Sequence, residues 1–421
     1  MDTEALTAID KRHLWHPFTP MRVWLDEQPL IIAAAEGNEL IDTDGRRYLD
    51  GVSSLWCNVH GHRHPAIDAA IRAQLDRVAH STLLGLASVP SIELAGKLAF
   101  VAPPGLTKVF YSDSGSTAVE IALKIAFQAH QLRGTKRTKF LVLDNAYHGD
   151  TIGSVSLGGI DLFHQIFQPL LFNTVRLQPT IEALEAAFSE HGADAAALVV
   201  EPLIQGAAGM LVQPVGFLAR ARSLCDTHGV LLICDEVATG FGRTGTLFAC
   251  EQEGVTPDLM CVAKGISGGY LPLAATLATD ALFDTFLGAP AERLTFFHGH
   301  TYTGNPLACA AALASLALFE DGSLMNRVRS NAAHLGNRLE KLGTLPRVRE
   351  IRRRGLMVGI ELHPAEGRRL GLEVCRAVRD KGVILRPLGD VIVLMPPLSF
   401  GPVELDRLVE VVHEAIDEVC P

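Results

Sequence analysis

The sequence lacks the features that mark membrane, secreted and nucleic-acid-binding proteins. It has no apolar run near the roughly 18 residues that a membrane span needs. Its start, MDTEALTAIDKRHLW, carries acids where a secretory signal carries basic residues. It also has no basic excess, because 37 Lys and Arg stand against 47 Asp and Glu, for a net charge of −10. We therefore expect a soluble protein that binds neither membranes nor nucleic acids.

Cysteine is scarce and never paired in a C-x-x-C motif. The eight cysteines among 421 residues are scattered, and several of them, such as Cys234, Cys261 and Cys309, lie within apolar runs. This placement is typical of buried free thiols in a reducing compartment. We expect a cytoplasmic protein.

A metal-binding pattern is also missing. The histidines of HGHRH and HGH, which end at His64 and His300, alternate with other residues. A zinc helix of the H-E-x-x-H type would place them one helical turn apart. No fitting acid lies near them, so we expect no metal site.

What the sequence does contain is an alternation of short apolar strands with amphipathic helices. The predicted strands are TKVFYS, KFLVLDN, AALVVEP, VLLICDE, LMCVAKG and LAATLAT. Helical stretches such as STAVEIALKIAFQAH and FLARARSLCDTHG lie between several of them. This order predicts an α/β fold whose mostly parallel central sheet carries helices on both faces. Ligands of such sheets bind beyond the carboxyl ends of the strands.

The two ends of the chain depart from this pattern. The first 60 residues predict a short helix and a hairpin that turns at DTDGRRYLDG, and the last hundred predict a long helix, three strands and a closing helix. We predict a large cofactor-binding domain at 61–315 and one smaller α+β domain built from 1–60 and 316–421. We interpret the arginine run 352–354 as a solvated face.

A lysine follows one of the predicted strands. Lys264 ends LMCVAK and precedes Gly265, with Gly268 and Gly269 close behind. Most lysines lie on the surface. A lysine at the end of a buried strand, however, can have its pKa lowered by desolvation and can form a Schiff base. Both interpretations stay open on this stretch alone.

A candidate phosphate site opens a long helix. After the strand that ends in FYS, Gly115 and Ser116 leave backbone N–H groups bare at a helix N-terminus, where a phosphate can bind. The spacing of Thr117 and Glu120 predicts a capping box. The lysine of a Walker loop is missing, and an ordinary capped helix is the alternative.

Asp235 is an acid at the end of the apolar strand LLICD, where an unpaired carboxylate would be costly. Pyridoxal phosphate needs a lysine for its aldehyde, an anion site for its phosphate, and a carboxylate that keeps its pyridine nitrogen protonated. Lys264, the pair Gly115 and Ser116, and Asp235 supply all three. The combination predicts pyridoxal 5'-phosphate as the cofactor.

The glycines of GFGRTG, residues 240–245, also fit the G-x-G-x-x-G template of dinucleotide-binding proteins. That template opens a helix and is followed by an acid about 20 residues on. Here Asp235 and Glu236 precede the glycines, and TLFACEQEG is a weak helix opening. A nicotinamide-dependent dehydrogenase is therefore only a distant alternative.

LLICDEVATGFGRTG, followed by PDLMCVAKGISGG, resembles the signature of the class III aminotransferases, with aspartate and lysine 29 positions apart (264 − 235). HLWHPFTPM, GHRHP, YSDSGS, NAYHGDT, EPLIQGAAGM, FFHGHTYTGNPLACAAA and LRPLGDVIVLMPP extend the similarity over essentially the whole chain. They resemble the branch that converts 8-amino-7-oxononanoate to 7,8-diaminononanoate in biotin biosynthesis. The resemblance implies a fold-type I pyridoxal phosphate-dependent transferase, a homodimer, and a turn at GFGRTG.

The resemblance also implies cofactor contacts. Lys264 would be the catalytic residue and carry the cofactor. Asp235 would bind the pyridine nitrogen, and Tyr147 would stack on the ring and line the substrate site. Gly115 and Ser116 would hold the phosphate.

Further residues would contact the substrates or come from the second subunit. Gly299, His300 and Thr301 would approach from the partner, with Thr301 on the cofactor phosphate. Arg386 would receive the carboxylate of the keto substrate. The substrate channel would be shaped by Phe18, Leu55, Trp56, Tyr147 and Arg243.

The sequence leaves two amino donors open. Family members that use S-adenosylmethionine read WHPY and carry a tryptophan pair after SS, whereas this chain has WHPF and SSLW, with Phe18 and Leu55 at the changed positions. A sulfonium cation is attracted by tryptophan faces, so these changes favour the family's lysine-using branch. S-adenosylmethionine remains the other candidate donor.

Two other functions are alternatives to this prediction. A broad-specificity ω-transaminase would use the same chemistry on other amines. A catalytically inactive binding protein would need Lys264 or Asp235 to be replaced, and both are present.

Overall fold

A seven-stranded sheet forms the centre of the protein, which we describe from a computed structural model over residues 2–160 and 165–420. The order of the strands is β4-β12-β11-β10-β7-β5-β6. Their bounds are β4 Leu106–Ser112, β5 Lys139–Leu143, β6 Val175–Leu177, β7 Ala195–Val200, β10 Leu231–Asp235, β11 Leu259–Val262 and β12 Ala274–Thr279.

The sheet is parallel except at β12, which runs antiparallel to both β4 and β11. All six residues of β7 are buried, as expected for a central strand that is covered on both faces. The six predicted strands are confirmed. The edge strand β6 was not predicted, because three residues carry too little periodicity to be recognised.

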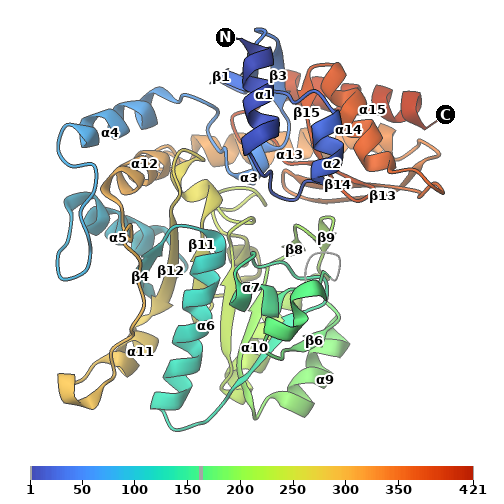
Figure 1. The fold of residues 1–421 in the computed structure, drawn as a ribbon. Helices are drawn as coiled ribbons and strands as arrows, with labels where there is room; N and C mark the ends of the chain where they lie inside the picture. Colours follow the sequence, from blue (N-terminus) through green and yellow to red (C-terminus); the bar gives the residue numbers. More distant parts are fainter. Residues whose placement is uncertain (1, 161–164, 421) are drawn as a thin grey trace.

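Helices cover both faces of this sheet (Figure 1). The helices of this part of the chain are α4 Pro65–Leu75, α5 Val89–Val101, α6 Gly115–Leu132, α7 Ile152–Leu157, α9 Ile181–His191, α10 Phe217–His228, α11 Asp280–Phe283 and α12 Pro306–Ala317. Of these, α4 packs against α12. The helix α10 ends where Gly229 takes up a left-handed conformation with φ 65°.

The start of α6 corrects one prediction. Its N-cap is Ser114, whose side chain accepts a hydrogen bond from the backbone N–H of Thr117, so the capping box joins Ser114 and Thr117. Glu120 lies too far into the helix to cap it. Its carboxylate instead accepts the backbone N–H of Gly153 at 2.7 Å.

The two ends of the chain lie together at the top of Figure 1. One four-stranded sheet has the order β1-β2-β3-β15, and it thus joins three strands of the first fifty residues to one near the C-terminus. A second has the order β13-β14-β17-β16. The strands are β1 Ile32–Glu36, β2 Glu39–Asp42, β3 Arg47–Asp50, β13 Val348–Arg354, β14 Met357–Leu362, β15 Val383–Ile384, β16 Arg386–Leu388 and β17 Val391–Leu394.

The remaining helices belong to the same part of the molecule. They are α1 Thr3–His13, α2 Met21–Asp26, α13 Ser323–Leu342, α14 Leu370–Asp380 and α15 Pro402–Val419. The helix α15 packs against both α13 and α14. The domain boundaries near residues 60 and 315 stay predictions.

The strand β13 corrects the interpretation of Arg352 as part of a solvated face. Its side chain is 8% exposed and donates to the carbonyl of Gly209 from Nε at 3.1 Å and from Nη2 at 2.9 Å. It also forms ion pairs with Glu350 and Glu361. The arginine run belongs to an edge strand. Alternate side chains of a strand face opposite sides, so Arg352 can be buried while Arg353, the next residue in the run, is exposed.

Two global features bear on the environment of the protein. Within the described ranges, no helix is both long and apolar enough to cross a bilayer. All eight cysteines have free thiols, and seven of them are buried.

Candidate active site

A cavity of about 710 Å³ opens at the carboxyl ends of the central strands. Lys264 follows β11, Asp235 ends β10, and Gly115 opens the helix after β4. All three line the cavity, together with Trp56, Ser116 and Tyr147. Residues that are far apart in the sequence therefore meet where an open α/β sheet binds its ligands.

Lys264 reaches into this cavity from a strained backbone position. Its φ is 46°, in the left-handed region that residues other than glycine rarely adopt. Its Nζ lies 4.9 Å from the centre of the Trp56 ring. Burial lowers the pKa of Lys264, and the carboxylates of Asp235 and Glu201 oppose that shift. A lysine with a lowered pKa is a better nucleophile near neutral pH.

Asp235 is held by a buried histidine. Its Oδ2 lies 2.7 Å from Nδ1 of His148, and its Oδ1 accepts the backbone N–H of Val237 at 3.0 Å. Burial lowers the pKa of His148, but the hydrogen bond and charge of Asp235 outweigh burial, so the net shift is upward. The imidazole and the Val237 N–H together fix the carboxylate in one orientation, which suits a partner of a pyridine nitrogen.

Glu201, one residue beyond β7, is a second buried acid on the cavity wall. It accepts the backbone N–H of Gly206 at 2.9 Å and that of Tyr147 at 3.4 Å. Burial raises the pKa of Glu201 to about 7, although the charge of His148 opposes the shift. Glu201 thus ties the loop that carries Tyr147 to the β8 strand, Ile204–Gln205.

The predicted phosphate site lies at the start of α6. The backbone N–H groups of Gly115 and Ser116 belong to the first turn and have no acceptor within the helix. The hydroxyl of Ser116 pairs with that of Thr151 at 2.7 Å. A Cβ on Gly115 would come within 2.6 Å of the Val237 side chain, so only glycine fits there.

The side chain of Tyr147 spans the cavity wall. Its hydroxyl donates to Asp150 at 2.8 Å. Burial, followed by the hydrogen bond to Asp150, raises the pKa of Tyr147, so the phenol stays protonated. A fixed, neutral aromatic ring beside Asp235 is suited to stack on a planar cofactor.

A smaller, mostly apolar cavity of about 130 Å³ continues from the first one. The predicted substrate residues that line it are Phe18, Leu55, Trp56, Tyr147, Lys264 and Arg386. The guanidinium of Arg386 lies 5.8 Å from the centre of the Phe18 ring. Among residues 2–160 and 165–420, no carboxylate forms an ion pair with Arg386. A carboxylate on a ligand would therefore have a cation at this end of the cavity.

Arg243 lies behind the cavity wall and lines neither cavity. Its side chain is 1% exposed and donates to the carbonyls of Pro396 at 2.6 Å and Asn58 at 2.8 Å, with a longer contact of 3.4 Å to that of Trp56. Burial lowers the pKa of Arg243 to about 10. The guanidinium is used by main-chain carbonyls, and the part of Arg243 in shaping the substrate channel stays a prediction.

Gly299, His300 and Thr301 do not line the cavity of their own chain. Gly299 and Thr301 are exposed, and His300 lies 4.0 Å from Asp113. The structure thus brings together the other predicted cofactor residues and leaves these three on an outer loop.

The GFGRTG segment forms consecutive turns that follow β10, and the next helical element is a short 3-10 turn at Ala249–Glu253. Gly242 has φ 90°, and a Cβ there would come within 2.6 Å of Leu398. The glycines therefore serve tight turning and close packing. They do not open a helix for a dinucleotide.

The alternating histidines have separate partners. His60 pairs with Ser315 at 3.0 Å, and His62 pairs with Asp50 at 2.9 Å. No group of three or more His, Cys, Asp or Glu side chains in the described part of the chain is placed to hold a metal ion.

One wall of both cavities rests on an unusual backbone turn, Ser53–Trp56. Its four residues have φ values of 52°, 47°, 73° and 70°. Left-handed helix costs L-residues about 1–2 kcal/mol each, or about 4–8 kcal/mol over the turn. Such strain persists only where the surroundings fix it, and it gathers at functional sites.

Two residues of the cavity, His148 and Glu201, were not among the predicted site residues. His148 directly follows Tyr147 in NAYHGD, and Glu201 ends AALVVE as Asp235 ends LLICD. The signal for Glu201 was present, because an acid at the carboxyl end of a buried strand is rare. No sequence pattern indicates that His148 bonds Asp235, since 87 residues separate them.

The residues present fit the predicted cofactor. The cavity holds a lysine with a lowered pKa, a carboxylate with a histidine behind it, and bare N–H groups at a helix start. These groups match the aldehyde, the pyridine nitrogen and the phosphate of pyridoxal phosphate.

Comparison with known proteins gives the same picture. The sequence profile described as aminotransferase class-III matches residues 21–416. The chain is 58% identical to the adenosylmethionine-8-amino-7-oxononanoate aminotransferase of Nitratidesulfovibrio vulgaris, over 98% of this chain and 82% of that one. It is 48% identical to the protein of the same name from Geobacter sulfurreducens, over 99% and 98%.

Solved structures agree with this result. The adenosylmethionine-8-amino-7-oxononanoate aminotransferase of Methanocaldococcus jannaschii superposes with a TM-score of 0.97 at 44% identity, over 99% of each chain. An (S)-enantioselective omega-transaminase from Thermomicrobium roseum superposes with a TM-score of 0.94 at 35% identity, over 100% of this chain and 99% of that one. The predicted fold class is thereby confirmed.

Proposed function

The chain belongs to the class III aminotransferase family, and from that premise we propose that it transfers an amino group to the ketone of 8-amino-7-oxononanoate. The product is 7,8-diaminononanoate, and the reaction belongs to biotin biosynthesis. The enzyme is a pyridoxal phosphate-dependent aminotransferase. The observation that carries the proposal is a pair of cavities that share Trp56, Tyr147 and Lys264, with Asp235 lining the larger one and Arg386 the smaller one.

The roles of the cofactor residues follow from their positions. When bound, pyridoxal phosphate supplies an electron sink for the bond that breaks at the substrate carbon. Lys264 would hold the cofactor, and its free Nζ would take the proton from the amine-bearing carbon of the donor. Asp235 holds the pyridine nitrogen, with His148 behind it. Gly115 and Ser116 bind the phosphate. Borohydride reduction and peptide mapping should place the label on Lys264.

The acceptor is oriented by its two ends. Its ketone must lie within reach of Lys264, and its carboxylate binds Arg386 through a bidentate pair. The apolar walls of the smaller cavity, which include Leu55, Trp56 and Leu388, suit the methylene chain between them. Arg386, the apolar walls and Lys264 together favour a substrate with a carboxylate at one end and a ketone some distance along an apolar chain.

The donor is L-lysine or S-adenosylmethionine, and the site favours L-lysine. The smaller cavity offers the rings of Phe18 and Trp56 and the aliphatic Leu55. Lysine needs a slim apolar channel and polar ends, whereas an adenosyl sulfonium needs room and further aromatic surface. The names of the relatives include adenosylmethionine, which makes it the donor to compare directly.

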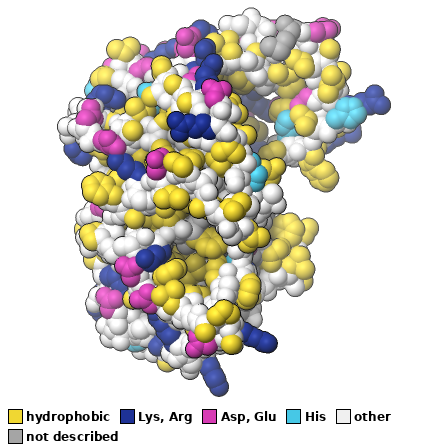
Figure 2. Space-filling view, turned by 90° about the vertical axis from the view of Figure 1, so that its left-hand side faces the viewer, with side chains coloured by type: hydrophobic (Ala, Val, Ile, Leu, Met, Phe, Trp, Pro, Cys, Tyr) yellow, Lys and Arg dark blue, Asp and Glu magenta, His cyan; other side chains and the backbone are white. Residues whose placement is uncertain are grey.

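A homodimer completes the site. Leu84 and Phe297 are 90% and 81% exposed on loops that come together where His80 lies 4.8 Å from Tyr302, measured between ring centres. Figure 2 views this side of the molecule and shows hydrophobic side chains spread over it. An exposed apolar surface of this kind is typical of a subunit interface. From that interface, Gly299, His300 and Thr301 reach the partner's cavity, with Thr301 on the phosphate.

The buried free thiols support a cytoplasmic enzyme.

A broad ω-transaminase is the second candidate, because the Thermomicrobium roseum enzyme superposes over the full length of the chain. Steady-state assays with purified enzyme, each donor and a panel of ketones separate the two. We expect kcat/KM for 8-amino-7-oxononanoate to exceed that for simple aliphatic ketones by orders of magnitude. Equal values would favour the ω-transaminase.

A further inference from the structure

The turn Ser53–Trp56 presents substrate-facing side chains from a left-handed backbone. Leu55 is 47% exposed at the rim of the smaller cavity, and Trp56 is 8% exposed on the wall of both cavities. Hydrogen bonds from Trp56 N to Val52 O at 2.9 Å and from Cys57 N to Ser53 O at 3.0 Å close the turn. These two hydrogen bonds do not determine whether the turn is left- or right-handed. Its left-handed conformation is therefore fixed by groups outside the turn.

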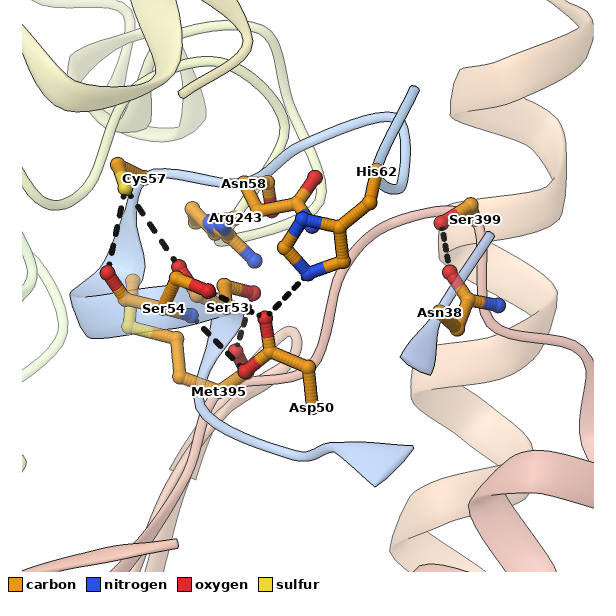
Figure 3. Close-up of polar contacts among 10 residues, drawn as sticks. All are labelled: Asn38, Asp50, Ser53, Ser54, Cys57, Asn58, His62, Arg243, Met395 and Ser399. Atoms are coloured by element: carbon orange, nitrogen blue, oxygen red, sulfur yellow. Dashed lines mark hydrogen bonds and ion pairs between the residues drawn. The ribbon is translucent and has the colours of Figure 1, made fainter. Parts of the chain in front are cut away.

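Asp50 holds the centre of the turn (Figure 3). Its Oδ1 accepts the backbone N–H of Ser54 at 2.9 Å, and its Oδ2 accepts the Ser54 hydroxyl at 2.7 Å. His62 donates to the same Oδ2 at 2.9 Å, and Asp50 has no exposed surface. Burial raises the pKa of Asp50, but the hydrogen bonds from His62 and Ser54 outweigh burial and lower it. Asp50, which we call the clamp of the turn, is therefore a charged carboxylate.

Other contacts lie mainly at the ends of the turn, apart from the Cys57 thiol, which donates to the carbonyl of Ser54 at 3.4 Å. The Ser53 hydroxyl donates to the carbonyl of Met395 at 2.6 Å, and Arg243 donates to that of Asn58 at 2.8 Å (Figure 3). Nearby polar atoms are left without partners in the described part of the chain, among them Trp56 Nε1 and both side-chain polar atoms of Asn58. Strain together with unsatisfied polar atoms marks a segment shaped for function over stability.

We propose that Asp50 is a positioning residue for substrate selection. It lines neither cavity, so it acts through Ser54, whose left-handed conformation sets where Leu55 and Trp56 stand opposite Lys264. The wall is thus in place before a substrate arrives, and binding does not have to order it. This inference deepens the proposed function and rests on it for the identity of the substrate.

The test compares Asp50→Ala with a matched control, Asp42→Ala. Asp42 is also a buried carboxylate that fixes a turn, since its Oδ1 accepts the backbone N–H groups of Asp44 and Arg46, but that hairpin lies outside both cavities. We expect both variants to lower the melting temperature. Only Asp50→Ala should raise KM for acceptor and donor, by at least about tenfold, while kcat changes less.

A rescue variant separates positioning from general stability. Glycine adopts the left-handed region without penalty, so Asp50→Ala combined with Ser54→Gly should recover much of the lost KM. The control adds Lys136→Gly to Asp50→Ala, because Lys136 also has a positive φ, 52°, but is exposed and lines no cavity. It should leave KM as it is in Asp50→Ala. If Asp50→Ala does not fold, the same comparison is made in Asp50→Asn.

Unchanged KM in the Asp50 variant, or equal rescue by both glycines, would overturn the inference. Borohydride labelling of Lys264 should be normal in every variant, which gives a readout apart from turnover. Should the wild type reject 8-amino-7-oxononanoate, the proposed function fails, and the clamp is tested with the ketone it does accept.

Discussion

His148 and Asp235 form a buried pair in which imidazole Nδ1 lies 2.7 Å from carboxylate Oδ2. Neither residue is more than 4% exposed. The other oxygen of Asp235 accepts the backbone N–H of Val237, so the carboxylate is fixed at both of its atoms. The carboxylate that is proposed to bind the pyridine nitrogen therefore stands in one orientation, with the His148 imidazole behind it.

Replacing Asp235 by Asn should leave the fold intact and slow amino transfer by orders of magnitude, because an amide cannot keep the pyridine nitrogen protonated. Single-turnover absorbance of the cofactor-loaded protein measures the rate. Glu236→Gln is the matched control: Glu236 is the next residue, equally buried, and bonded to Thr239 and the Cys250 N–H outside the cavity. Near-normal transfer in Asp235→Asn would count against the assignment.

Arg386→Ala should raise KM for 8-amino-7-oxononanoate strongly while the donor half of the reaction stays almost normal. The reason is that the guanidinium has no carboxylate partner in the described structure and is free to bind one on the substrate. Arg386→Lys keeps the charge but not the fork geometry, so it should restore little. Pre-steady-state measurement of the two halves provides the comparison. Equal damage to both would indicate a structural arginine.

L-lysine should discharge its amino group to the enzyme faster than S-adenosylmethionine does. With Phe18 and Leu55 in place of a tyrosine and a tryptophan, the cavity rim offers fewer aromatic and polar groups that could contact an adenosyl sulfonium. Mixing the cofactor-loaded enzyme with each donor separately and following its visible absorbance reports the transfer. A rapid change with S-adenosylmethionine and none with lysine would reverse the choice of donor and leave the acceptor chemistry unchanged.

Glu201 should make the folded state less stable as the pH rises. Burial raises the pKa of Glu201 from 4.5 to about 7, so between these values the folded protein binds a proton that the unfolded chain releases. The free energy of unfolding therefore falls with increasing pH across that window. Urea denaturation of Glu201→Gln should show a shallower fall than the wild type. The exposed Glu410→Gln is the control, and identical pH profiles for all three proteins would refute the prediction.

The site at the carboxyl ends of the central strands could be predicted well from the sequence, because buried parallel strands are nearly continuous apolar runs. Acids and lysines that interrupt such runs, such as Asp235 and Lys264, are therefore conspicuous. The sequence predicted less well where polar residues build structure. The arginines of β13 resembled a solvated face, and Arg352 is buried because Gly209 comes from a distant turn and Glu361 from the neighbouring strand β14.

Tertiary contacts explain the remaining differences. Nothing in SSLW indicates a left-handed turn, since serine, leucine and tryptophan all prefer right-handed or extended backbone. The turn exists because Asp50 and Met395 bind it, and Met395 lies more than 300 residues away. The same holds for Arg243, whose place behind the wall depends on the carbonyls of Pro396 and Asn58.

The most direct test of the account is a single turnover in two halves. Enzyme loaded with an amino group by the donor is freed of that donor and mixed with 8-amino-7-oxononanoate. We predict about one equivalent of 7,8-diaminononanoate per active site by mass spectrometry, recovery of the original visible absorbance, and neither result with Lys264→Ala. If the loaded enzyme makes no diaminononanoate yet transfers its amino group to simple ketones, the proposed function is contradicted.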